Sequence, residues 1–156
     1  MLRLPSNQKE YDEYWSGDPA FIQPADSDDA RIEHAAKIKR ARETGDWSSL
    51  LIDGQQPTKF VMQPIDGDQW RWLVDESTRD DEHKMGPAVF WQLMFRCACV
   101  SVKNLGVQVN DKPVRHPKLG AIAPIDIPNL LDKIDASIVT ELAGAAFERA
   151  RNLNPL

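Results

Sequence analysis

The sequence predicts an α+β fold: a mostly helical single domain around one buried central helix, with a small antiparallel sheet and an extended N-terminal arm. Three observations predict it. The longest apolar run, residues 87–104, spaces its polar residues as a helix does. Residues 57–65 alternate apolar and polar side chains as a strand does. Prolines interrupt the first 27 residues. We therefore divide the chain into an arm, residues 1–27, and one globular domain, residues 28–156.

Length and charge limit the classes of function. A chain of 156 residues has the size of one domain, and its formal net charge of −5 argues against a general binder of nucleic acid or of anionic membranes. The apolar run is not a membrane span, because its uninterrupted apolar part is shorter than about 20 residues and Arg96 lies in its middle. Only two cysteines are present, and the N-terminus lacks the apolar core of an export signal. These features predict a protein of the reducing cytoplasm.

The arm is rich in aromatic residues, which carry large buriable surfaces. Two alternatives follow: these side chains fold back onto their own domain, or they dock on another chain. The candidate partner-binding residues are Tyr11, Tyr14, Trp15 and Phe21.

Residues 28–44 are predicted to form a surface helix. Ser27 or Asp28 caps its start, acidic residues occupy the first turn, basic residues follow, and Gly45 ends it. Its basic cluster is either a solvated face or a contact for an acidic partner; the cluster comprises Lys37, Lys39, Arg40 and Arg42. A short helical turn is expected within residues 46–51.

A strand and a second helix come next. Phe60 and Met62 alternate with Lys59 and Gln63 in the strand of residues 57–65, whose flanking prolines favour an edge or a small sheet. The turn at 66–68 leads into a helix over 69–77, with Trp70 and Leu73 on one face. Residues 79–84 are predicted to form a charged loop.

The central helix is predicted over residues 87–104. Gln92, Arg96 and Lys103 fall on one narrow stripe, and apolar side chains occupy the rest of the circumference, as in a helix that neighbours surround. Because the second half of this run contains β-branched residues, a strand is the alternative assignment for that end.

The remaining elements are short, except the last. A small hairpin around Asn110 and Asp111 is expected in 107–114, an irregular loop in 116–124 and a short helix in 127–134. Asp135 or Ser137 caps the last helix, which ends near residue 151. Its predicted core face consists of Ile138, Leu142, Ala145 and Ala146.

No linear motif for catalysis, phosphate binding or metal binding is present in the sequence. The three histidines, His34, His83 and His116, fall in different segments and are interpreted as surface residues. We therefore predict a protein that is not an enzyme and has no catalytic residues, metal site or cofactor. A polar pocket that gathered one histidine with several carboxylates would favour an enzyme instead.

From residue 57 onward the order of parts resembles a known family. The strand at 58–65, the helix with Trp70 and Leu73, the long helix at 90–103 and the final helix around 138–144 are similar to small tail-assembly chaperones and related minor structural proteins of tailed bacteriophages. The resemblance covers residues 57–153 and rests on layout. It implies a non-enzymatic protein that binds other virion or assembly proteins, or itself as a homo-oligomer, in the host cytoplasm or the virion.

A rival hypothesis comes from the local acidic clusters. The chain would be a small acidic inhibitor of a host protein, for example a nucleic-acid-binding defence factor. Its contact residues would be Asp75, Glu76, Asp80, Asp81 and Glu82.

Overall fold

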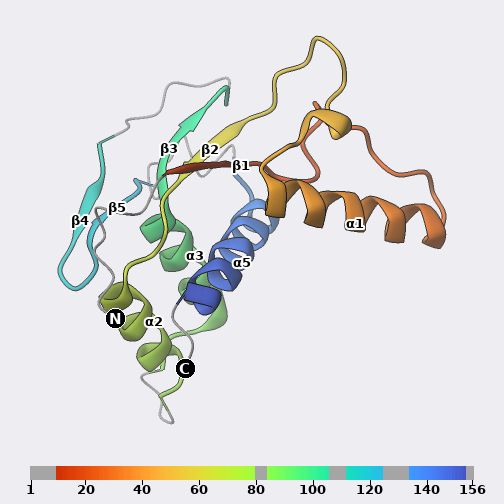
Figure 1. Ribbon diagram of the computed structural model, residues 1–156. Coiled ribbons are helices and arrows are strands. Elements are labelled where there is room, and N and C mark those ends of the chain that lie inside the picture. The colour runs from red at the N-terminus through yellow and green to blue at the C-terminus, as the bar shows by residue number, and fades with distance from the viewer. Residues whose placement is uncertain (1–9, 80–83, 106–111, 125–133, 154–156) are drawn as a thin grey trace.

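The computed structural model of the chain describes residues 10–79, 84–105, 112–124 and 134–153. It confirms the α+β fold, because helices accompany two small antiparallel sheets (Figure 1). The elements in order are β1 (Tyr11–Glu13), α1 (Asp28–Thr44), the 3-10 turn η2 (Ser48–Leu50), β2 (Lys59–Met62), α2 (Gly67–Ser77), α3 (Pro87–Ala98), β3 (Cys99–Lys103), β4 (Val114–His116), β5 (Gly120–Ile122) and α5 (Ala136–Leu153).

Local signals set the ends of the helices. The Ser27 side chain accepts a hydrogen bond from the Ala30 N–H at the start of α1, and Gly45, at a φ of 78°, ends it in the left-handed conformation that glycine adopts without strain. A capping box between Asp66 and Gln69 starts α2. These boundaries agree with the sequence prediction to within two residues.

The larger sheet has the order β1-β2-β3, and β2 is its central strand. Tyr11 pairs with Met62 on one side of β2, and Val102 pairs with Phe60 on the other. The sequence predicted β2, left a strand as the alternative for the segment that forms β3, and did not predict β1. β1 comes from the arm, so the described part of the arm is a structural part of the domain.

The predicted central helix over 87–104 is too long. Helix α3 ends at Ala98, and residues 99–103 form β3. Val100 and Val102 are β-branched, which favours the extended backbone, and the edge of β2 supplies the hydrogen-bond partners that make a strand stable there. Lys103 therefore does not share a helical stripe with Gln92 and Arg96.

The expected irregular loop at 116–124 is also corrected. β4 and β5 pair as a hairpin whose turn lies at residues 117–119, and the His116 Nδ1 atom accepts hydrogen bonds from the Lys118 and Leu119 N–H groups. Gly120 has a φ of 77°, which suits glycine in a tight turn. The centre of the predicted 107–114 hairpin and almost all of the predicted 127–134 helix lie outside the described residues.

The main core lies where α3 and α5 pack together beneath the larger sheet (Figure 1). Met94 and Phe95 of α3 and Leu142 of α5 are completely buried, and the Phe95 ring meets the Phe60 ring edge-on at a centroid distance of 5.9 Å. Asp135 caps α5, because its carboxylate accepts the N–H groups of residues 137 and 138.

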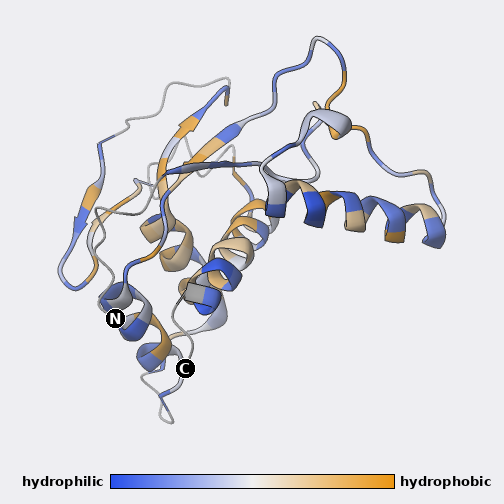
Figure 2. Ribbon diagram, in the orientation of Figure 1, coloured by the Kyte–Doolittle hydropathy of each residue, from blue (hydrophilic) through white to orange (hydrophobic). Residues whose placement is uncertain are grey.

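Helix α1 lies outside this core and packs on a small second cluster. Only Ile38 and Ala41 of its 17 residues are buried. In Figure 1 it extends away from α2 and α3, and Figure 2 shows hydrophilic residues over most of its length. The second cluster consists of Phe21, Ile38, Ala41, Trp47 and Leu50, with Tyr14 packed against it. We call α1 together with this cluster the α1 lobe.

We predict that the α3–α5 contact dominates the stability of the domain. Leu142→Ala removes a fully buried side chain from that contact and should lower the free energy of unfolding by about 3 kcal/mol. Val89→Ala is the matched control: its side chain is 49% exposed at the start of α3, so its effect should stay within about 0.5 kcal/mol. Urea unfolding followed by circular dichroism measures both. Equal losses in the two variants would contradict this view of the core.

A candidate binding groove between α1 and α5

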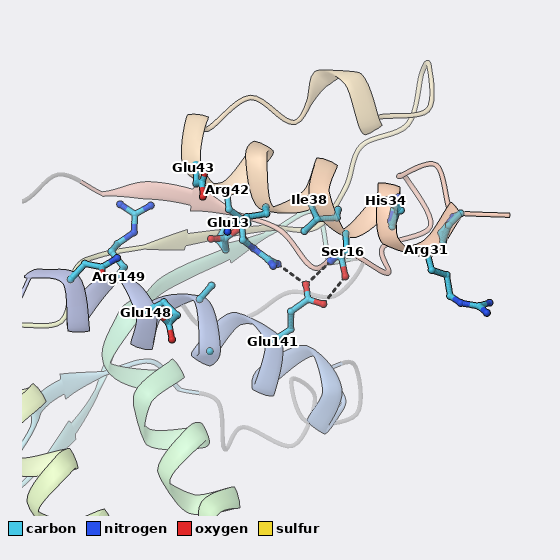
Figure 3. A pocket seen from close by; sticks show the side chains of 16 residues that line it. Glu13, Ser16, Arg31, His34, Ile38, Arg42, Glu43, Glu141, Glu148 and Arg149 are labelled. Carbon is cyan, nitrogen blue, oxygen red and sulfur yellow. Dashed lines mark hydrogen bonds and ion pairs between the residues drawn. The ribbon is translucent and has the colours of Figure 1, made fainter. Parts of the chain in front are cut away.

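An open groove of about 870 Å³ separates α1 from α5 (Figure 3). Its apolar lining includes Ala35 and Ile38 on the α1 wall and Gly144 and Ala145 on the α5 wall. A side chain added at Gly144 would meet no atom within 4 Å, so the α5 wall is free of bulk there. The charged residues that line the groove balance in sign: Glu13, Glu43, Glu141 and Glu148 against Arg31, Lys39, Arg42 and Arg149.

Arg42 joins α1 to both the arm and α5. Its Nε donates to a carboxylate oxygen of Glu13 at 3.1 Å, and one terminal nitrogen donates to Glu141 at 2.6 Å and to the Tyr14 carbonyl at 3.0 Å. The guanidinium also lies 5.5 Å from the Trp47 ring centroid, within cation–π range. A planar fork with five donors is suited to several acceptors at once. We call Glu13, Arg42, Glu141 and Ser16 the Arg42 clamp.

Ser16 completes the clamp from the arm. Its N–H and its hydroxyl both donate to the Glu141 carboxylate, at 2.8 and 2.6 Å. Burial acts to raise the pKa of Glu141, but the hydrogen bonds from Ser16 and the charge of Arg42 outweigh it, so the pKa is lowered. Glu141 is therefore held in its ionised form.

Glu13 is in a different electrostatic position. It is only 4% exposed, and this burial raises its pKa despite the opposing charge of Arg42. A buried carboxylate keeps its charge only when a cation is close, so removing Arg42 would leave an unpaired buried acid. Because Arg42 belongs to α1, the buried charge of Glu13 favours the position of α1 that brings the guanidinium to it.

Arg149 of α5 lies on the other side of the arm. Its guanidinium carbon stands 3.6 Å from the centroid of the Tyr11 ring, which is a close cation–π contact. Burial raises the pKa of Tyr11 to about 12, and Arg149 lowers it only partly. The arm is thus held to α5 at both Ser16 and Tyr11.

The aromatic residues predicted to bind a partner contact their own chain. Phe21 is 1% exposed and stacks on Trp47 at 5.3 Å, and Tyr14 meets both rings edge-on. Tyr11 and Trp15 pack against the main core. This is the first of the two alternatives stated for the arm, and Phe21 is not accessible to another protein in this arrangement.

Sequence reasoning missed the clamp. Arg42 was grouped with Lys37, Lys39 and Arg40 as one basic cluster, yet only Arg42 is partly buried. The signal that could have found it is its helical phase: Arg42 follows Ile38 by four residues, so the two side chains share a face. No local signal marks Glu141, its partner 99 positions away.

The residues considered for chemistry are dispersed. His34 lines the groove, His116 packs edge-on against Trp72 at 5.6 Å, and His83 lies outside the described residues. Cys97 and Cys99 are buried thiols, and burial raises the pKa of each to about 12. In the described ranges, no three His, Cys, Asp or Glu side chains gather closely enough to hold a metal ion.

The acidic residues of the inhibitor hypothesis are only partly described. Asp75 is exposed, and Glu76 forms an ion pair with Arg79 at 3.1 Å. Asp80, Asp81 and Glu82 lie outside the described residues.

We predict a pH-dependent contribution of Glu141 to stability. Its pKa is lower in the folded than in the unfolded chain, so its stabilisation is complete above the unfolded pKa of about 4.3 and is lost as the pH falls through the folded value. Glu141→Gln should cost about 1 kcal/mol at pH 7, and the difference from wild type should shrink toward pH 3. Glu13 has the opposite pH dependence, because its raised pKa favours the fold at low pH. This contribution is present in both proteins, so it largely cancels in the difference between their free energies of unfolding.

Glu148→Gln is the control for that measurement. Glu148 lines the same groove two turns further along α5, and its ion pair with Arg151 is exposed. Urea unfolding at several pH values should show almost no difference for this variant. A constant difference between wild type and Glu141→Gln from pH 7 to pH 3 would contradict the assigned role of the clamp.

Comparison with known proteins adds no relative. No protein-family model, no characterised protein and no solved structure matches the chain. None of the helices in the described ranges is both long enough and apolar enough to cross a membrane.

Proposed function

We propose that the protein is a non-enzymatic protein-binding module of the virion-assembly type, and that the groove between α1 and α5 receives a segment of its partner. The observation that supports this most is the groove itself. It is open, about 870 Å³ in volume, and is lined by both apolar and charged side chains. An amphipathic helix placed in such a groove buries its apolar face and keeps its polar face at the rims.

The small side chains of the α5 wall favour a helical occupant. Gly144 and Ala145 leave room for a helix backbone to approach closely, and Ala35 and Ile38 offer apolar contact from the opposite wall. The balanced charges of the rims favour a specific partner over a general polyanion, since no single sign of charge dominates.

The virion-assembly part of the proposal rests on the order of parts from residue 57 onward. The inhibitor hypothesis has weaker support, because half of its described acidic pair, Glu76, is already neutralised by Arg79.

We predict that a partner contacts position 145. A photo-crosslinking amino acid at Ala145, on the groove wall, should form an adduct with a different protein in cells that naturally make the chain. The same group at Thr140, which is exposed on α5 but outside the groove, should not. Mass spectrometry identifies the adduct. A virion or assembly protein would support the proposal, a host defence factor would favour the inhibitor hypothesis, and no adduct at 145 would contradict groove binding.

The contents of the groove favour acid–base catalysis as a second candidate. His34 shares the groove with four glutamates, and Glu13 is a buried acid with a raised pKa, which is typical of catalytic carboxyls. Against this, the Ser16 hydroxyl donates to Glu141, and His34 makes no hydrogen bond within the described part of the chain. A nucleophile, a base and an orienting group are therefore not connected.

A turnover assay separates the two candidates. We expect wild type to hydrolyse chromogenic esters, phosphate esters and glycosides no faster than buffer, because the two least exposed carboxylates of the groove, Glu13 and Glu141, already accept hydrogen bonds from Arg42 and Ser16. Turnover that His34→Ala abolishes, without loss of stability, would instead support the enzyme.

A further inference from the structure

An aliphatic side chain of α1 is left in solvent at the rim of the groove. Ile32 is 69% exposed, and Ala35 and Ala36, three and four residues later, are exposed beside it. Residues at this spacing share one face of a helix, and this face lies about 120° around α1 from the buried Ile38. A face of this kind on a rigid helix gains free energy when another apolar surface covers it.

The charges of α1 are unevenly distributed along its length. The first half has three acidic residues, Asp28, Asp29 and Glu33, and one base, Arg31; the second half has four basic residues, Lys37, Lys39, Arg40 and Arg42, and one acid, Glu43. A second α1 placed antiparallel would bring each acidic half beside a basic half. It would also oppose the two helix dipoles, which is favourable. The face with Ile32 is therefore complementary to itself.

Two cations of the groove stand at the end where that second helix would begin. Within the described residues, neither Lys39 nor Arg149 forms an ion pair. In Figure 3, α1 runs from Arg31 to Glu43 and α5 from Glu141 to Arg149 in the same general direction. An antiparallel helix between them would bring its acidic first turn to Lys39 and Arg149.

We propose that two copies of the chain pair antiparallel through α1, each helix lying along the rim of the other's groove. A pairing centred at the level of residue 34 sets Ile32 opposite Ala36 and Asp29 opposite Lys39 of the second copy. The contact is the same on both copies, so the assembly closes as a twofold dimer and does not grow. It goes beyond the proposed function by naming a second copy as occupant, and a foreign partner would compete with it for the groove.

The dimer should be weak. A 17-residue helix is about 25 Å long, and one helix pair covers less than the about 800 Å² per partner of a standard interface. We expect a Kd of about 10–100 µM, rising with salt because charge pairs contribute to the contact.

Charge reversal with rescue tests the pairing. In sedimentation equilibrium over about 1–300 µM, which brackets the expected Kd, wild type should show a monomer–dimer equilibrium. Asp29→Lys and Lys39→Glu should each be monomeric. In the twofold pairing, residue 29 of each copy faces residue 39 of the other, so each variant has like charges at both of these contacts. An equimolar mixture of the two variants should dimerise again, since every facing pair then has opposite charges. Lys37→Glu, on another face of α1, should behave as wild type.

Several outcomes would overturn the pairing: a monomeric wild type across the range, dimers of both single variants, or a mixture that stays monomeric while circular dichroism shows both variants folded. The result is separable from the partner proposal. A monomeric wild type that still crosslinks a foreign protein from position 145 overturns self-pairing alone. A dimer whose only adduct from position 145 is with itself overturns the foreign partner alone.

Discussion

The ion pairs of Arg42 determine where α1 sits. The helix buries only two side chains of its own, so little apolar area fixes it against the domain. Arg42 instead connects it to Glu13 of the arm and Glu141 of α5 through short, charge-assisted hydrogen bonds. One buried acid and one partly buried acid depend on the same guanidinium. The lobe, the arm and the groove therefore form or separate together.

The sequence predicted those elements that local chemistry determines. The ends of α1 follow from Ser27 and Gly45, and most of the buried face of α5 follows from the spacing of Ile138 and Leu142. Ala145, predicted on that face, lies on the groove wall instead, because the adjacent Ala146 takes the core position. Of the larger sheet, only β2 was predicted as a strand outright, from its alternating pattern. β3 continues the apolar run of α3 with no intervening turn, so its β-branched residues left helix and strand both open, and its pairing with β2 decides for the strand. β1 has three residues, too few to carry a pattern.

The groove could not be predicted for a related reason. Its walls are helices that the sequence does identify, but their distance and angle result from contacts between distant residues. Arg42 resembles its basic neighbours in the sequence, and Ser16 is one polar residue among many in the arm. Glu141 is 99 positions from Arg42 and 125 from Ser16, so no short motif in the sequence marks these residues as partners. Site prediction here needs the folded backbone.

The distance in sequence between the partners of the clamp affects how the protein is made. Ser16 and Arg42 leave the ribosome long before Glu141, so the part of the clamp that joins the arm and α1 to α5 cannot form until α5 is made. During this interval α1 has its local caps and the pair of Arg42 with Glu13, but not its connection to α5. Closing so long a loop is also slow compared with helix formation. The wall of the groove that α5 supplies is thus absent until α5 has been synthesised, so the groove forms late although α1, its other wall, is made early.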